Sequence, residues 1–196
     1  ARKAEARERG KLLGLGISSY IEVCGVAPSK WIGAVGEGWG AAMWESSNIR
    51  VHLTGKVVVT MGTQSHGQGH ETTYAQIIAT EIGLPADNIK VEDGNTDTAP
   101  YGLGTYGSRS TPVSGAATAM ACRKIKAKAQ MIAAYMLEVH DDDLEWDVDR
   151  FRVKGNPERF KTMTELAWAA YHGVPPGMEP GLEAVNYYDP PNLTFP

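Results

Sequence analysis

The chain has 196 residues, of which 42% are hydrophobic and 21% are charged, and its formal net charge is −4 at pH 7. This length allows one large domain or two small ones. The acidic balance argues against a nucleic-acid partner, because phosphate backbones attract basic surfaces. No apolar run reaches the roughly 20 residues of a membrane span, and no signal peptide opens the sequence. Cys24 and Cys122 lack a CxxC spacing and therefore indicate two buried thiols in a reducing, cytoplasmic setting.

The first 40 residues are predicted to hold the end of a helix, one strand and a glycine-rich loop. The opening "ARKAEARERG" is typical of the last turns of a helix that stops at Gly10 or Gly14. Residues 13–25 alternate in the manner of a strand, and the glycines of residues 25–40 predict an irregular loop. Neither end resembles a natural domain terminus, so we expect a fragment of a longer polypeptide in which residues 41–196 belong to a second domain.

A β-α-β unit is predicted between residues 57 and 94. Alternating apolar residues indicate a strand at 49–54, and the tight turn "TGK" joins it to a second strand in the apolar run at 57–61. Apolar residues then recur at three- and four-residue steps, which predicts a helix from His70 to Ile82 that Gly83 ends. The segment "NIKVEDGN" supplies the following strand.

The second half is predicted to combine a long loop with further helices and strands. About twenty residues, "TDTAPYGLGTYGSRSTPVSG", show no periodicity, and loops of this length are usually functional. A helix from about Gly115 to His140 follows, with "RKIKAKAQ" as its solvated face. The remaining elements are a hairpin, a short helix capped by Thr162 or Thr164 and a last strand, at 144–155, 162–173 and 182–189. The fold class is therefore α+β, with mixed sheets and packed helices.

The first candidate for chemistry is the turn "GQGH", which runs from Gly67 to His70. A strand, a glycine-rich turn and a helix in this order can hold an anion, because glycines let backbone N–H groups approach it and the helix dipole adds partial positive charge. The turn matches neither the Walker pattern nor GxGxxG. An ordinary polar turn therefore remains an alternative.

The second candidate is the loop "GTYGSRST", which also precedes a helix and offers small hydrogen-bond donors and acceptors at Gly107, Ser108, Ser110 and Thr111. Arg109 offers a planar fork for a phosphate or for the edge of a ring. Two such loops beside one β-α-β unit could bind a long anionic cofactor from both sides.

Other arrangements are weaker. His66 and His70 have the spacing of metal ligands on a helix, but no third ligand lies near them in the sequence. A triad of Ser65, His70 and Asp97 lacks a nucleophile-elbow sequence.

Three stretches carry a resemblance to a known family: "GTQSHGQGHETTYAQIIATEIGLP", "VEDGNTDTAPYGLGTYGSRSTPVSGAATA" and "LEWDVDRFRVKG". They resemble the large subunits of aerobic carbon monoxide dehydrogenases, in the xanthine oxidase family of molybdenum hydroxylases. The resemblance covers the chain from about Tyr20 to Pro196. It implies that residues 41–196 are part of the molybdopterin-binding region and that both loops bind molybdopterin cytosine dinucleotide. The contacting residues would be Gly67, Gln68, Gly69 and His70 in the first loop and Gly107, Ser108, Arg109 and Ser110 in the second.

The resemblance also implies an activity and partners. The parent enzyme would oxidise CO with water to CO2 at a molybdenum–copper centre. It would pass the electrons to [2Fe-2S] clusters on a small subunit and FAD on a medium subunit, in a dimer of heterotrimers. Such a complex would be cytoplasmic, with peripheral association to the inner membrane face left open.

Two departures from the family pattern limit these expectations. Position 66 is His where the close relatives are expected to have Gln, which changes the hydrogen-bond geometry at this point. The family's cysteine segment (Ala-Tyr-x-Cys-Ser-Phe-Arg) and its glutamate segment (Gly-Val-Gly-Glu) are both missing from the chain. We therefore predict no catalytic residue and no metal ligand in these residues and expect the chain alone to be inactive. A copper-free molybdenum hydroxylase of an organic substrate and a non-catalytic fragment without cofactor remain alternatives.

Overall fold

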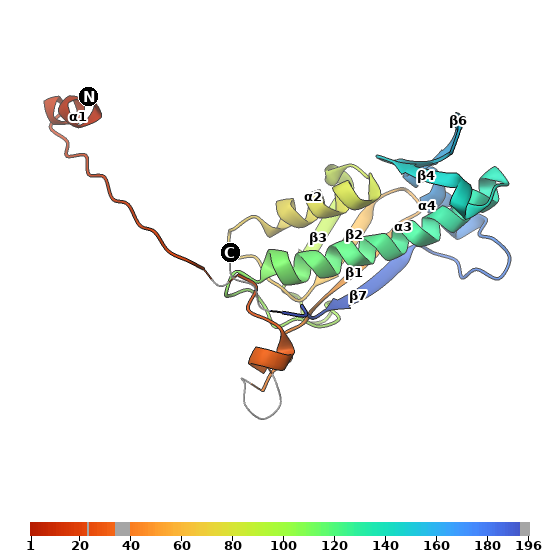
Figure 1. Ribbon diagram of the computed structural model, residues 1–196, viewed down its shortest axis with the longest axis horizontal. Coiled ribbons are helices and arrows are strands. Elements are labelled where there is room, and N and C mark those ends of the chain that lie inside the picture. The colour runs from red at the N-terminus through yellow and green to blue at the C-terminus, as the bar shows by residue number, and fades with distance from the viewer. Residues whose placement is uncertain (23, 34–39, 193–196) are drawn as a thin grey trace.

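The computed structural model describes residues 1–22, 24–33 and 40–192. Its body is a four-stranded sheet that carries two helices on one face, with a smaller sheet and a further helix at one end (Figure 1). Helix α1 (Arg2–Glu8) lies at the far end of an extended segment that projects from this body (Figure 1). The α+β class predicted from the sequence is confirmed.

The main sheet has the strand order β3-β2-β1-β7. Strands β1 and β2 form an antiparallel hairpin, β3 pairs parallel with β2, and β7 pairs antiparallel with β1. Buried side chains alternate with exposed or half-buried ones along β2, which places one face of that strand in the core. All four strands were predicted, and their bounds are Glu45–Val51, Val57–Met61, Ile89–Asp93 and Glu183–Tyr188.

Helices α2 (His70–Ile82) and α3 (Ala116–Leu137) pack against each other and against the sheet. Gly83 ends α2 in the left-handed conformation, with φ of 70°, and its N–H donates to the carbonyl of Ala79. The predicted β-α-β unit is therefore confirmed. Short π-helical or 3-10 turns join the longer elements at Ser29–Gly33, Ala86–Asn88, Ser110–Gly115 and Asp141–Asp143.

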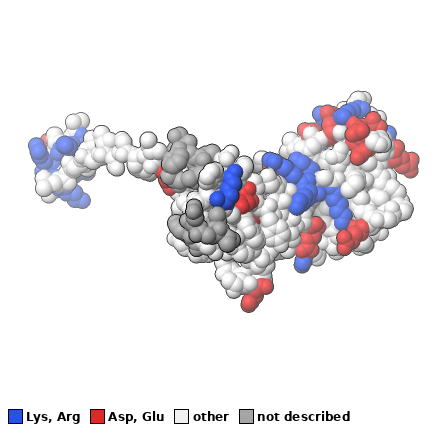
Figure 2. Space-filling model, turned by 60° about the horizontal axis from the view of Figure 1, so that its bottom comes forward, with Lys and Arg blue, Asp and Glu red and all other residues white. Residues whose placement is uncertain are grey.

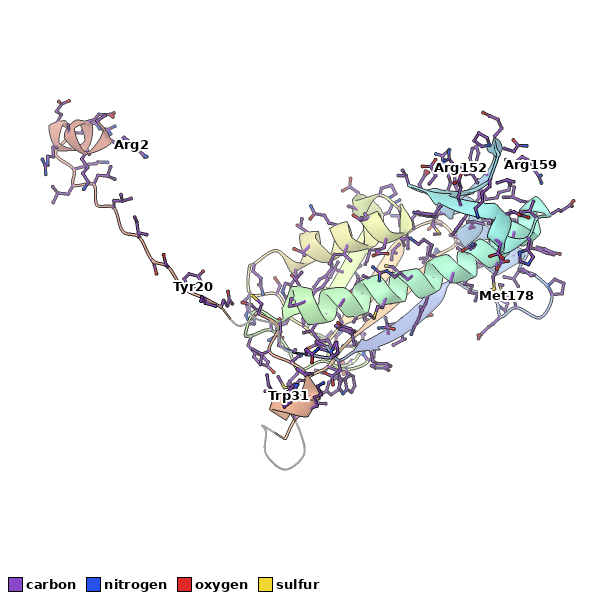
Figure 3. The ribbon with its side chains drawn as sticks, in the orientation of Figure 1. Arg2, Tyr20, Trp31, Arg152, Arg159 and Met178 are labelled. Carbon is purple, nitrogen blue, oxygen red and sulfur yellow. The ribbon has the colours of Figure 1, made fainter. Side chains whose placement is uncertain are left out.

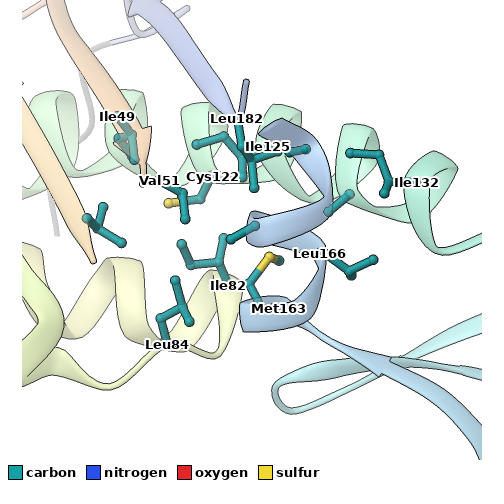
Figure 4. Close-up of a cluster of buried hydrophobic side chains, with 14 of the residues drawn as sticks. Ile49, Val51, Ile82, Leu84, Cys122, Ile125, Ile132, Met163, Leu166 and Leu182 are labelled. Carbon is teal, nitrogen blue, oxygen red and sulfur yellow. The ribbon is translucent and has the colours of Figure 1, made fainter. Parts of the chain in front are cut away.

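The core lies between the sheet and these helices (Figure 4). Ile49 and Val51 of β1 contribute fully buried side chains, and Ile125 of α3 packs into the same cluster. Burying each such side chain stabilises the fold by roughly 1.5–3 kcal/mol. This packing fixes the position of β2 and α2, whose connecting loop was predicted to bind an anion.

A second sheet and helix α4 (Met163–His172) lie at the opposite end of α3 from its N-terminus (Figure 1). Thr162 accepts a hydrogen bond from the N–H of Glu165, whose side chain accepts one from the N–H of Thr162, so the predicted cap is confirmed as a capping box. The third strand of this sheet was not predicted, because its polar sequence shows no alternation. The strands are β4 (Leu144–Asp147), β5 (Arg150–Val153) and β6 (Asn156–Thr162).

The strand predicted at residues 13–25 is wrong for the described residues of that range. The chain there is extended but lies in neither sheet, and Ile17 is 89% exposed. Figure 3 shows Tyr20 on this segment, away from the body. An alternating sequence needs a neighbouring strand edge to pair with, and no described strand lies beside it. Cys24 is correspondingly exposed, which corrects the prediction of two buried thiols, whereas Cys122 is buried in the core.

The loop predicted at residues 25–40 is described only in part, because residues 34–39 lie outside the described residues. Within it, Ser29–Gly33 forms a π-helical turn that carries the exposed Trp31 (Figure 3). On the face that Figure 2 shows, Lys and Arg lie near Asp and Glu over much of the body. Among the described residues, no helix is long and apolar enough to cross a membrane.

Candidate functional site

The first loop connects β2 to α2 and leaves its backbone uncovered. Gly67 and Gly69 have φ of 98° and 85°, a region that favours glycine. A Cβ atom at either position would meet nothing within 4 Å, so these glycines are explained by backbone conformation and not by crowding. The N-cap residue of α2 is Gly69, which has no side chain to cap the first N–H groups of the helix, so these groups face the loop.

His70, the first residue of α2, is held by a carboxylate at the end of β3. It is 5% exposed, and its Nδ1 lies 3.1 Å from Oδ2 of Asp93. A carboxylate accepts hydrogen bonds, so this contact places the proton on Nδ1 and leaves Nε2 as an acceptor. The amide nitrogen of Gln68 lies 3.0 Å from that Nε2 and donates to it. The β-α-β unit thus fixes both the ring and the tautomer of His70.

The second loop is joined to the first by hydrogen bonds. The hydroxyl of Thr105 donates to the carbonyl of Gln64 at 2.7 Å and accepts from its N–H at 3.0 Å. Further along, Gly107 and Ser108 both have positive φ, of 55° and 51°. Because Ser108 is not glycine, this conformation marks a constrained turn. Its hydroxyl donates to the carboxylate of Glu22.

Both loops line one pocket of about 450 Å³. The predicted residues Gln68, His70, Ser108, Arg109 and Ser110 are among its walls, while the three predicted glycines are not. Five other lining residues were not among the predicted contacts: His66, Thr73, Thr105, Tyr106 and Thr111. Thr73 could have been found from its position one helical turn after His70, but nothing local in the sequence pointed to Thr105 or Tyr106.

Arg109 lies in the wall of this pocket, but its side chain turns inward. It is 0% exposed, and its guanidinium forms an ion pair with Glu45 of β1. A role as a planar fork for phosphate would require the side chain to leave this arrangement. Burial raises the pKa of the Glu45 carboxyl, and the Arg109 guanidinium opposes that rise by stabilising the carboxylate. The sequence analysis missed Glu45, because 64 residues separate it from Arg109.

The triad on Ser65, His70 and Asp97 does not form, because the carboxylate beside Nδ1 of His70 belongs to Asp93. Asp97 is exposed, and its N–H donates to the side chain of Asn95. The one cluster of three potential metal ligands in the described parts of the chain is His140, Asp141 and Asp142, which the sequence analysis did not propose.

These features define an α+β domain in which two backbone loops, presented by one β-α-β unit, enclose a polar pocket. The chain matches the molybdopterin cofactor-binding domain family over residues 1–196 and belongs to that family.

Similar proteins of known activity include carbon monoxide dehydrogenases. The chain is 68% identical, over 99% of its length, to the carbon monoxide dehydrogenase large chain of Afipia carboxidovorans. It superposes on the crystal structure of Cu,Mo-CO dehydrogenase with a TM-score of 0.86 and 67% identity, over 99% of this chain. Quinoline 2-oxidoreductase from Pseudomonas putida 86 gives a TM-score of 0.78 and 35% identity, again over 99% of this chain. The chain spans 24% of each of the first two proteins and 25% of the third.

Proposed function

We propose that the pocket between the two loops binds molybdopterin cytosine dinucleotide. The observation that carries this proposal is that both loops, singled out independently in the sequence, line the same pocket. Its volume of about 450 Å³ suits part of a large ligand, of which other segments of a longer chain would enclose the rest.

The groups that line the pocket, and the loop backbone beside it, fit an anionic, hydrogen-bonding ligand. The uncapped N-terminus of α2 and the uncovered backbone at Gly67 and Gly69 suit a pyrophosphate. Gln68 and His70 offer amide and imidazole groups, and Ser110 offers a hydroxyl. Ser108 would exchange its hydrogen bond to Glu22 for one to the ligand, because a carboxylate beside a phosphate is unfavourable. Gly107 and Arg109 would shape the same wall.

We further propose that the chain is part of the large subunit of an aerobic carbon monoxide dehydrogenase. The 68% identity to one such subunit supports this reaction over the oxidation of an organic heterocycle, for which the similarity is 35%. The bound molybdenum–copper centre would supply the oxidation of CO with water to CO2, two protons and two electrons. FAD and [2Fe-2S] clusters on medium and small subunits would take up the electrons, in a dimer of heterotrimers located in the cytoplasm or at the inner face of the membrane.

Metal and nucleotide analysis of the native complex tests this proposal. We expect molybdenum, copper and CMP in near-equal amounts after acid hydrolysis of the pyrophosphate bond of the cofactor. Molybdenum and CMP without copper would indicate a hydroxylase of an organic substrate, and the absence of molybdenum would refute the assignment of the pocket.

The pocket itself is tested by Gln68→Ala in the same complex. We expect a lower content of molybdenum and CMP than in the unmodified enzyme. Gln76→Ala is the matched control, because Gln76 is an exposed glutamine on α2 that does not line the pocket. Equal cofactor content in both variants would count against the assignment of Gln68.

A further inference from the structure

A buried ion pair lies beneath the second loop. The side chains of Glu45 and Arg109 are both 0% exposed, and they are in direct contact. Removing two charges from water carries a desolvation cost that the attraction between them only partly offsets. A pair of this kind therefore contributes little to stability compared with apolar side chains of similar size. Its position under the pocket wall indicates a different role.

Arg109 joins three segments that are distant in the sequence. Besides Glu45, its guanidinium donates to the carbonyl oxygens of Met43 at 2.5 Å, Gly104 at 3.0 Å and Val26 at 3.4 Å. These acceptors come from the loop before β1, from the second loop itself and from the segment that follows the extended arm. Arg109 thus holds the second loop against the start of β1.

Glu45 and its neighbour Ser46 hold the preceding part of the same loop. Oε1 of Glu45 accepts from the N–H of Leu103 at 3.0 Å. The hydroxyl of Ser46 accepts from the N–H of Tyr101 at 2.9 Å and donates to its carbonyl. A Cβ atom at Gly102 would lie 2.4 Å from Oε2 of Glu45, so the loop backbone sits directly on this carboxylate. The first residues of β1 therefore act as a template for residues 101–109.

The anchored arginine lies between two residues that face the pocket. Ser108 and Ser110 both line the pocket, while the guanidinium of the residue between them points into the protein. Ser108 also has a φ of 51°, which the fixed position of Arg109 helps to maintain. If the guanidinium lost its partner, the constraint on both serines would weaken.

We propose that Glu45 is a positioning residue of the cofactor site: it holds Arg109 inside the protein so that Ser108 and Ser110 face the pocket. This inference rests on the proposed function of the pocket. It assigns to Arg109 a role inside the loop in place of direct contact with the cofactor.

The test is Glu45→Gln in the full enzyme complex. The quantities measured are molybdenum and CMP per folded large chain and the rate at which both are lost. We expect loss about tenfold faster than in the unmodified enzyme, equivalent to about 1.4 kcal/mol. Glu183→Gln is the matched control, because Glu183 pairs with Arg50 of β1 at 3.0 Å in an exposed position. The control should retain the cofactor as the unmodified enzyme does.

A double-mutant cycle separates positioning from direct binding. If Glu45 and Arg109 act as a unit, Arg109→Gln loses cofactor no faster than Glu45→Gln does. The variant that carries both substitutions is then no worse than Glu45→Gln alone. If Arg109 binds the cofactor directly, Arg109→Gln loses it while Glu45→Gln retains it, and that result would overturn the inference. A purely structural role would lower the yield of folded chain but leave the cofactor per folded chain unchanged, which would also overturn it.

Two further measurements keep the outcome decisive. Should Glu45→Gln fail to fold, Ser46→Ala removes the neighbouring loop contacts without leaving a buried charge unpaired, and it should also accelerate cofactor loss. Unchanged retention in Ser46→Ala would then overturn the inference. An unmodified complex without molybdenum and CMP would refute the proposed function, whereas a loaded complex that is insensitive to Glu45→Gln would refute only the role of Glu45.

Discussion

The backbone crossing between Gly62 and Gly102 allows a sharp test of how the second loop is supported. Gly62 follows β2, and a Cβ atom placed there would lie 2.2 Å from Cα of Gly102 and 2.7 Å from the carbonyl oxygen of Tyr101. These atoms belong to the backbone, which cannot rotate away as the end of a flexible side chain can. Gly62→Ala must therefore push the two segments apart.

The size of the effect follows from this distance. The contact is about 1.2 Å shorter than the 3.4 Å at which ordinary van der Waals contact begins. Overpacking of this kind typically costs about 1–3 kcal/mol, and backbone on both sides places this case toward the upper end. The reduced entropy of the unfolded chain returns about 0.4–1 kcal/mol. We expect the free energy of unfolding to fall by roughly 2 kcal/mol in total, which lowers the melting temperature of a domain of this size by about 4–8 °C.

The assay is urea unfolding of the chain, followed by far-UV circular dichroism. Gly115→Ala is the control, because its backbone is helical and the nearest atom to its Cβ would be the end of the Ile77 side chain, at 3.2 Å. The next two atoms, Cγ2 of Thr111 at 3.7 Å and the carbonyl oxygen of Ser110 at 3.9 Å, lie at ordinary van der Waals distance. Alanine favours a helix over glycine by up to about 1 kcal/mol, so this variant should stay within that range of the unmodified chain. Equal unfolding midpoints for Gly62→Ala and Gly115→Ala would refute the proposed crowding.

Three further predictions concern separate elements. Asp93→Asn removes the charged acceptor of His70 and should lower the molybdenum and CMP content of the complex without changing its yield. Burial raises the pKa of the Cys122 thiol from 9.0 to about 12. The neutral buried thiol therefore stabilises the folded chain fully below pH 9, and this contribution is lost as the pH rises toward 12. The stability advantage over Cys122→Ala should therefore fall by about 1.4 kcal/mol between pH 8 and pH 10 in urea unfolding. Thr162→Ala should cost about 1 kcal/mol in the same assay, whereas Thr164→Ala, which leaves the cap intact, should cost less.

The sequence predicted the elements that depend on local signals. The helix from His70 to Ile82 was predicted with the observed bounds, because its apolar residues recur at helical spacing and Gly83 and Pro85 follow its last turn. A cap at Thr162 or Thr164 was predicted, and the structure has it at Thr162, whose partner Glu165 is three residues away. Alternation of apolar and polar residues from Ile49 to Thr54 and the turn around Gly55 predicted the hairpin of β1 and β2.

The errors concern elements whose structure depends on distant partners. Residues 13–25 alternate in the manner of a strand, yet strand pairing requires a second edge that the described part of the chain does not provide. Strand β6 shows the opposite case, because its polar residues contain no alternation, and β5 supplies the pairing that makes it a strand. The local sequence pattern alone therefore does not tell which of these two segments forms a strand.

Arg109 shows why the site was only partly predictable. An arginine between two serines in a glycine-rich loop resembles an anion ligand when only its neighbours are considered. Its actual partner, Glu45, lies on a strand 64 residues earlier, and that partner reverses the direction of the side chain. Because Glu45 and Ser46 belong to β1, the shape of the second loop depends on contacts with the sheet. The pocket is therefore a property of the folded domain, and the loop sequence does not by itself carry the geometry of the site.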